Sequence, residues 1–220
     1  MLFNKLKGTI RKPLAVHIVL SALPEILLLL GIGLLHINTA ANESTEELQH
    51  FAHDMADTQA KTTASVKLLL QTLAKVPEVR SGNGPACSAF FVSLLRENSS
   101  LATIHLVDLK GDLIGSASAT GQVNFAHTKH FRDAIAERTF VTGEFLVGVT
   151  LKVPVFTFGY PILDDKGAPR SVLLTSIRLD SFGEQFKRMR FPESSFVGVA
   201  DHNGLRIYRH PSLATLPLGV

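Results

Sequence analysis

Apolar residues follow three different patterns along the chain. Between residues 14 and 37 they form an almost unbroken run, whereas from about residue 44 to 76 they recur every three or four positions. From 104 to 179, and again from 196 to 208, short apolar segments alternate with polar residues and turns. In order, these patterns predict a membrane-spanning helix, a long amphipathic helix and a set of β-strands.

The first pattern, LAVHIVLSALPEILLLLGIGLLHI at 14–37, predicts a transmembrane helix. As a helix it would be about 36 Å long, enough to cross a bilayer core of about 30 Å. Its 15 Leu, Ile and Val residues outweigh the cost of Glu25, so the segment is predicted to insert despite Pro24. The basic residues before it place the N-terminus in the cytoplasm and the chain after Asn38 outside. A cleaved signal peptide is the alternative, because residues 39–41 are small.

The second pattern predicts a long helix within residues 38–80. Ser44-Thr-Glu-Glu47 matches a capping box and predicts a helix start, while Pro77 and the segment 81–85 predict its end. One stripe along this helix contains Leu48, Ala52, Met55, Thr62, Val66, Leu69, Leu73 and Val76. Packing on the following domain and pairing with a second copy explain this stripe equally well, so both remain open.

The third pattern predicts a five-stranded antiparallel sheet with helices on one side. Residues 104–118 form a strand, a turn and a strand, with Asp108 at the first turn position accepting a backbone N–H. Further strands are predicted at 142–149, 153–163 and 171–179, with a turn at 164–167. Helices are predicted at 86–96, at 130–137 and from Asp180 to about residue 190.

The hairpin at 104–118 is repeated near the end of the chain. At an offset of 93 residues, Asp108 aligns with Asp201 and Gly111 with Gly204. The apolar positions Ile104, Leu106 and Ile114 align with Val197, Val199 and Ile207. A full set of elements separates the copies, which predicts that a second module begins near residue 191.

Charge and composition narrow the function. The net charge of +3 is concentrated in the N-terminal residues Lys5, Lys7, Arg11 and Lys12, so no basic face for nucleic acid is indicated. Cys87 is the single cysteine and no internal disulfide is possible. No phosphate-binding loop, nucleophile elbow or kinase signature is present, so no catalytic residues are predicted in these 220 residues. His127 and His130 lack a third ligand at a known spacing, and neither a metal nor a cofactor is predicted.

Three segments carry a resemblance to a known family. They are HTKHFRDAIAERTFVTGEF at 127–145, FGYPILDDKGAPRSVLLTSIRL at 158–179 and DHNGLRIYRHP at 201–211. The chain resembles the double Cache (PAS-like) extracytoplasmic sensor domains of bacterial chemoreceptors, sensor histidine kinases and diguanylate cyclases. The resemblance implies an α+β fold with five parts: a cytoplasmic tail (1–13), a transmembrane helix (14–37), a long periplasmic helix (38–80), a first Cache module (81–190) and an incomplete second module (191–220).

The same resemblance implies where a ligand would bind. Family members that bind amino acids carry charged and aromatic partners where this chain has Thr128, His130, Phe131, Phe145, Val147 and Ser176. A zwitterion would lose both its partners here, so the ligand is expected to be a small molecule other than an amino acid. Lys129, His130 and Arg132 could hold an organic acid between apolar walls, or Lys129 could be solvated and the aromatic residues core. The candidate binding residues are Lys129, His130, Phe131, Phe145, Phe156, Tyr160 and Ser176.

These observations predict a single-pass inner-membrane protein whose periplasmic part senses a ligand, as a homodimer, in chemotaxis or two-component signalling. We expect the chain to be the front of a longer receptor, with a complete small protein as the alternative. Two other functions remain open: the sensory part of a histidine kinase or diguanylate cyclase whose catalytic half is missing, and a periplasmic scaffold or adhesion domain without a ligand.

Overall fold

The computed structural model describes residues 3–118, 121, 123–148, 151, 153–179, 196–200 and 203–211. Within these ranges, the side chains of 3–22, 33–45, 47, 207 and 210 are left undescribed. The chain divides into two units, residues 1–54 and residues 55–220. The helix predicted from Asp180 to about residue 190 lies outside the described residues.

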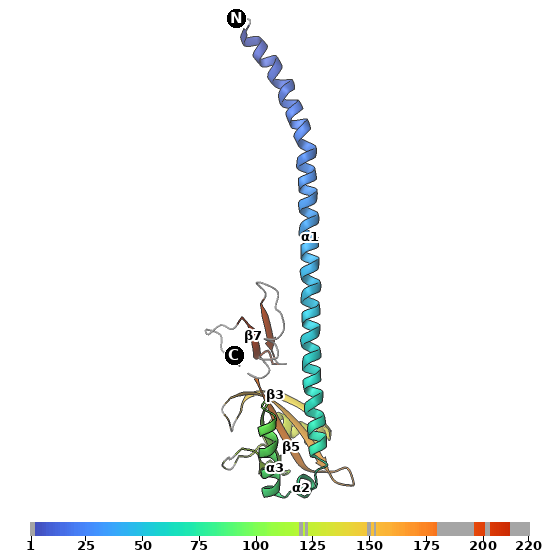
Figure 1. Cartoon of the computed structure of the whole chain (residues 1–220), viewed down its shortest axis with the longest axis vertical. Coiled ribbons are helices and arrows are strands. Elements are labelled where there is room, and N and C mark those ends of the chain that lie inside the picture. Colours follow the sequence, from blue (N-terminus) through green and yellow to red (C-terminus); the bar gives the residue numbers. More distant parts are fainter. Residues whose placement is uncertain are drawn as a thin grey trace. The chain divides into compact units, whose positions relative to one another are not determined.

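Helix α1 is continuous from Phe3 to Leu73 (Figure 1). The predicted helix start at Ser44 is therefore wrong, because residues 38–47 contain no Pro or Gly and nothing interrupts the helix there. The predicted end at Pro77 also needs correction: α1 ends at Leu73, and Pro77 begins the short helix α2 (Pro77–Ser81). Proline suits this first helical position because no partner is needed there for an N–H.

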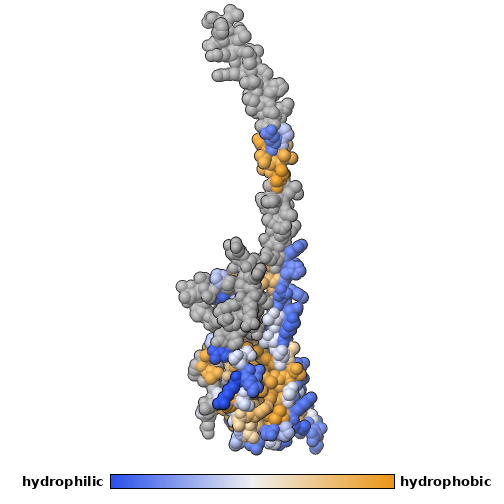
Figure 2. All heavy atoms as spheres, in the orientation of Figure 1, coloured by the Kyte–Doolittle hydropathy of each residue, from blue (hydrophilic) through white to orange (hydrophobic). Residues whose placement is uncertain are grey.

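In unit 1, the described side chains of α1 include an apolar group that Figure 2 shows as an orange band. Leu23, Leu30 and Ile32 are each more than half exposed, as are the four residues 26–29. No helix in the described part of the chain is long and apolar enough to cross a membrane. The span at 14–37 includes side chains outside that part and stays a prediction.

In the described part of unit 2, five strands form the predicted antiparallel sheet, in the order β2-β1-β5-β4-β3. The strands are β1 (Leu101–Val107), β2 (Leu113–Ser116), β3 (Val141–Val147), β4 (Pro154–Leu163) and β5 (Pro169–Arg178). Two turns begin as the sequence predicts: the Asp108 carboxylate accepts the N–H of Lys110 at 2.8 Å, and the Asp164 carboxylate accepts that of Lys166 at 2.9 Å. Gly111 and Gly167 take positive φ angles of 86° and 79° and close these turns.

Helices cover both faces of this sheet, which corrects the prediction of helices on one side. On one face, Leu70 of α1 and Phe91 of α3 (Gly84–Glu97) pack in a core cluster with Ile104, Phe158 and Leu173. On the other face, helix α4 (Lys129–Glu137) contributes a second cluster with β1, β3 and β5. Each strand residue points opposite to its neighbours, so strands buried on both sides read as nearly continuous apolar runs.

The stripe on the long helix is explained in part by this packing. Val66 and Leu73 are buried in the first cluster, with Leu69 and Val76 packed against it. These four positions confirm that the stripe packs on the following domain. Leu48 remains 46% exposed, and the homodimer stays a prediction.

The second hairpin, β6 (Val197–Ala200) with β7 (Arg206–His210), repeats the register of the first. Val107 pairs with Leu113, and at the offset of 93 residues Ala200 pairs with Arg206. The register shifts just before Val107 and, equivalently, just before Ala200. Gly204 has a φ of 80°, close to that of Gly111. The sequence repeat is therefore also a repeat of backbone geometry.

Candidate functional site

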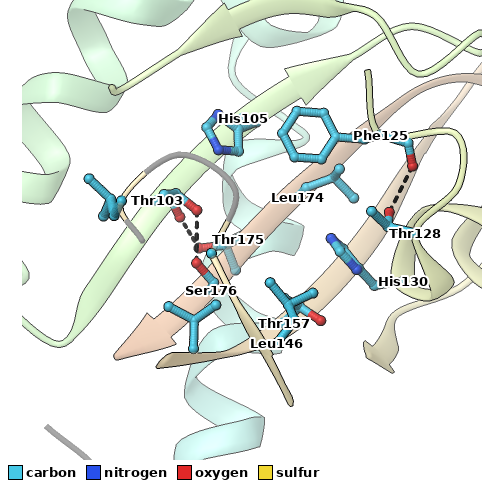
Figure 3. Close-up of a pocket in the computed structure, with 13 residues that line it drawn as sticks. Thr103, His105, Phe125, Thr128, His130, Leu146, Thr157, Leu174, Thr175 and Ser176 are labelled. Carbon is cyan, nitrogen blue, oxygen red and sulfur yellow. Dashed lines mark hydrogen bonds between the residues drawn. The ribbon is translucent and has the colours of Figure 1, made fainter. Parts of the chain in front are cut away.

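A cavity lies on the α4 side of the sheet (Figure 3). It encloses about 450 Å³ when solvent at its mouth is included. Its described lining combines apolar side chains with imidazoles and hydroxyls. These residues are Thr103, His105, Phe125, Thr128, His130, Leu146, Gly148, Leu151, Val155, Thr157, Leu174, Thr175 and Ser176.

Two glycines allow α4 to approach the sheet and place His130 beside the cavity. A Cβ on Gly159 of β4 would collide with the backbone oxygen of His130. A Cβ on Gly143 of β3 would lie 2.9 Å from the Cβ of His130 and overlap the hydroxyl of Thr157. Just before α4, the Thr128 hydroxyl donates to the carbonyl of Phe125 at 2.8 Å. His130 therefore lies on a helix that can approach the sheet this closely because Gly143 and Gly159 have no side chains.

His105 enters the cavity from β1 and has a defined tautomer. Its Nδ1 lies 2.9 Å from the Ser116 hydroxyl, and that hydroxyl donates to the carbonyl of Ser118 at 2.8 Å. Because the hydroxyl hydrogen is engaged, Nδ1 must carry the proton and donate, which leaves Nε2 as a hydrogen-bond acceptor. The ring lies 5.0 Å from that of Phe125. Burial lowers the pKa of His105 to about 4, so the imidazole is neutral near pH 7.

His130 is the unusual polar group of the site. It is only 4% exposed, and its Nδ1 is buried without a hydrogen-bond partner among the described residues. Burial, followed by the nearby His105, lowers the pKa of His130 to about 4. A buried polar atom without a partner costs about 1–3 kcal/mol, and such atoms are uncommon in folded proteins. His130 therefore brings to the cavity lining a buried imidazole with one unsatisfied ring nitrogen.

The hydroxyls of the cavity are mostly engaged with the protein. Thr175 donates to the carbonyl of Thr103 at 2.7 Å, and Thr157 donates to that of Glu144 at 3.1 Å. The hydroxyls of Thr103 and Ser176 lie 2.8 Å apart. Because only one of the two can donate to the other, one hydroxyl hydrogen of this pair remains for a ligand.

The structure brings His130 and Ser176 of the candidate residues together in the cavity. Lys129 does not line it and instead pairs with Asp133 one helical turn later. Phe131 is buried in the second core cluster, on the α4 side of the sheet. Phe156 and Tyr160 pack against the α1 cluster on the opposite face, and Phe145 pairs with Phe156 across the β3–β4 ladder.

Sequence reasoning missed His105, Thr103 and Thr157. The signal was present, because Thr103 and His105 lie two positions apart in the otherwise apolar segment LATIHLV. All seven residues of that strand are buried, so two polar residues on the same face indicate a polar interior site. Across the described residues, no group of three or more His, Cys, Asp or Glu is placed to hold a metal ion.

Comparison with solved structures shows which fold this is. The extracellular domain of rpHK1S-Z16, described as a histidine kinase, matches with a TM-score of 0.71 and 17% identity over 82% of this chain and 75% of its own. The sensor domain of the histidine kinase DctB from V. cholerae matches at 0.58 and 21%, over 76% and 66%. The ligand-binding domain of the chemoreceptor CtaA from Pseudomonas fluorescens, in complex with L-serine, matches at 0.57 and 13%, over 71% and 67%.

No protein-family model and no curated protein sequence matches the chain. At these identities, the structural likeness shows the fold alone. The chain has the fold of Cache-type extracytoplasmic sensor domains, which confirms the resemblance inferred from its sequence at the level of fold.

Proposed function

We propose that this chain is the ligand-sensing part of a membrane receptor, anchored through residues 14–37 with unit 2 outside the cytoplasm. The ligand is a small molecule other than an amino acid, bound in the cavity between α4 and the sheet. The buried imidazole of His130, which lines that cavity and whose Nδ1 has no hydrogen-bond partner among the described residues, is the observation that carries the proposal. The fold shared with solved sensor domains supports it.

The described lining argues against a zwitterionic ligand. It contains no Asp, Glu, Lys or Arg, and its two imidazoles are neutral near pH 7. An ammonium group would find no carboxylate there, and burying an unpaired charge is costly. A small molecule with a polar group and an apolar body fits this set of contacts better.

A thermal-shift panel tests the ligand class. The full chain in detergent micelles would be heated with short carboxylic acids, their amides and amino acids. We expect an acid or an amide to raise the melting temperature and L-serine to leave it unchanged, because a ligand at 100 times its Kd stabilises by about 2.7 kcal/mol. No shift with any compound would contradict the proposal and favour a scaffold without a ligand.

A matched pair of variants links such a shift to the cavity. Thr103→Val removes the hydroxyl that pairs with Ser176, so ligand stabilisation should decrease. Thr142→Val makes the same change at an exposed position of β3 and should leave ligand stabilisation intact. Equal shifts in both variants would place the ligand elsewhere.

Alkaline carbonate extraction tests the anchor. A protein with a spanning helix stays in the membrane pellet, whereas a peripheral protein is released. We expect the chain to remain in the pellet and a variant lacking residues 14–37 to be released. Release of the full chain would contradict the anchor.

A further inference from the structure

The cavity is neutral, and its unengaged polar groups lie on two histidines and one hydroxyl pair. His105 retains an acceptor at Nε2, the Thr103–Ser176 pair retains one hydrogen, and Nδ1 of His130 has no partner within the described residues. Around them, Leu146, Val155 and Leu174 provide apolar contacts. This set suits a ligand with one compact polar group and a short apolar tail, since the enclosed space is small.

The permanent cations nearby do not serve this cavity. Lys129 forms an ion pair with Asp133. Neither Lys129 nor the exposed Arg132 is part of the described lining. A carboxylate that entered as an anion would therefore be buried without a fixed positive partner. An unpaired buried charge is expensive, and sites of this kind change a protonation state instead.

We propose that the cavity binds a short monocarboxylate together with one proton from solvent, held between the ligand carboxylate and the imidazole of His130. The charges balance, because one anion and one proton enter a neutral cavity and leave the complex neutral. The inference rests on the proposed function and adds the class of ligand and the residue that recognises it. His130 acts as the group that senses the acid.

The surroundings of His130 favour this exchange. In the unliganded protein, burial keeps its pKa low, and His105 on β1, His127 before α4 and Lys129 on α4 lower it further, whereas Asp133 on α4 raises it. The backbone N–H and carbonyl of Glu144 in β3 form hydrogen bonds with the Thr157 hydroxyl. The cavity-lining residues of β4 and β5 are uncharged. A carboxylate beside the His130 imidazole would raise this pKa, because an opposite charge within about 4–6 Å favours the charged imidazole.

Calorimetry measures the proton directly. Acetate, propionate and butyrate would be titrated into the full chain in micelles near pH 7, in two buffers with different ionisation enthalpies. We expect the difference in binding enthalpy to correspond to uptake of about one proton, and Kd to rise about tenfold per pH unit above neutrality. Propionamide, which cannot bring a charge, should show no proton uptake.

Variants locate the proton. His130→Gln keeps a polar amide but cannot hold the proton, so uptake should vanish and the pH dependence of Kd should flatten. The exposed control His127→Gln should retain the uptake. The wild-type titration does not depend on the folding of any variant.

Each outcome has a distinct consequence. Carboxylate binding without proton uptake, or uptake retained in His130→Gln, would overturn the inference and leave the sensing function standing. The same holds if amides bind and the three carboxylates do not. If no compound binds, the proposed function itself fails.

Discussion

Acidification should destabilise the module that carries the cavity, through His105 and His130. Both are buried as neutral imidazoles with a pKa of about 4, below the value of about 6.5 that each regains on unfolding. Between these values the unfolded chain binds more protons than the folded chain. Stability is therefore complete above about pH 6.5 and is lost as the pH falls towards 4.

The size of the effect follows from the same two values. At about pH 5 each unfolded imidazole is almost fully protonated, while the folded one is mostly neutral. Linkage then gives a loss of about 2 kcal/mol for each histidine, or about 4 kcal/mol for both. Because a domain's stability is typically about 5–15 kcal/mol, this loss is easily measured.

Cys87 provides the assay. It is the single cysteine of the chain and is fully buried in the first core cluster, between the sheet and helices α1 and α3. A thiol reagent therefore reaches it when this core opens. The fraction labelled in a urea series reports unfolding of unit 2, whatever the state of the N-terminal helix. A disulfide reagent that works in mild acid allows the series to be repeated at about pH 7.5 and pH 5.

The comparison with His130→Gln isolates one histidine. The wild type should lose about 2 kcal/mol more than this variant between the two pH values, and His127→Gln should behave as the wild type does. Comparing variants at the same pH removes the pH dependence of the thiol reaction. Equal losses in the wild type and His130→Gln would refute the assignment of the effect to His130.

Three further substitutions test the packing, each by the same thiol-labelling assay. Gly159→Ala should displace α4 and cost about 1–3 kcal/mol, because its methyl group meets a backbone oxygen, whereas Gly198→Ala has its nearest neighbour at 3.6 Å and should cost less than about 1. Similar costs at the two glycines would be inconsistent with a close approach of α4. Asp108→Ala should cost about 1 kcal/mol through loss of its turn hydrogen bonds, and no change would mean that the turn forms without them. Leu70→Ala should cost about 2–5 kcal/mol at a fully buried position, while Leu68→Ala, 65% exposed, should be nearly neutral; equal values would contradict the packing of α1.

The fold was largely predictable because its signals are local. Alternation located the strands, and the D-x-x-G spacing identified two turns whose carboxylates accept backbone N–H groups as expected. The error at the start of the long helix has a local cause: Ser44 and its neighbours are equally compatible with a cap and with a continuing helix, and only the absence of a breaker decides. That α4 covers the second face depended on Gly143 and Gly159, whose role is visible only when the helix is in place.

The site was less predictable because it depends on which way each strand faces. The sequence predicts Phe156 and Tyr160 as binding residues, yet Val155 and Thr157, on the alternate positions of β4, are the ones that face α4. If the assumed strand register is shifted by one residue, the residues that face α4 and those that face the opposite side are exchanged. The prediction of His130 does not depend on strand orientation, because His130 lies near the start of helix α4.

In the proposed receptor, the same alternation would connect the cavity with the long helix. In β5, Leu174 and Ser176 line the cavity, while Leu173 and Ile177 belong to the cluster that holds α1. In β1, Thr103 and His105 line the cavity, while Ile104 and Leu106 pack in that same cluster. A ligand that draws these strands towards α4 moves the cavity-lining residues. Their neighbours in the chain, which pack with the long helix, must then move as well. Since close-packed cores transmit small displacements instead of absorbing them, we expect ligand binding to displace α1 through β1 and β5.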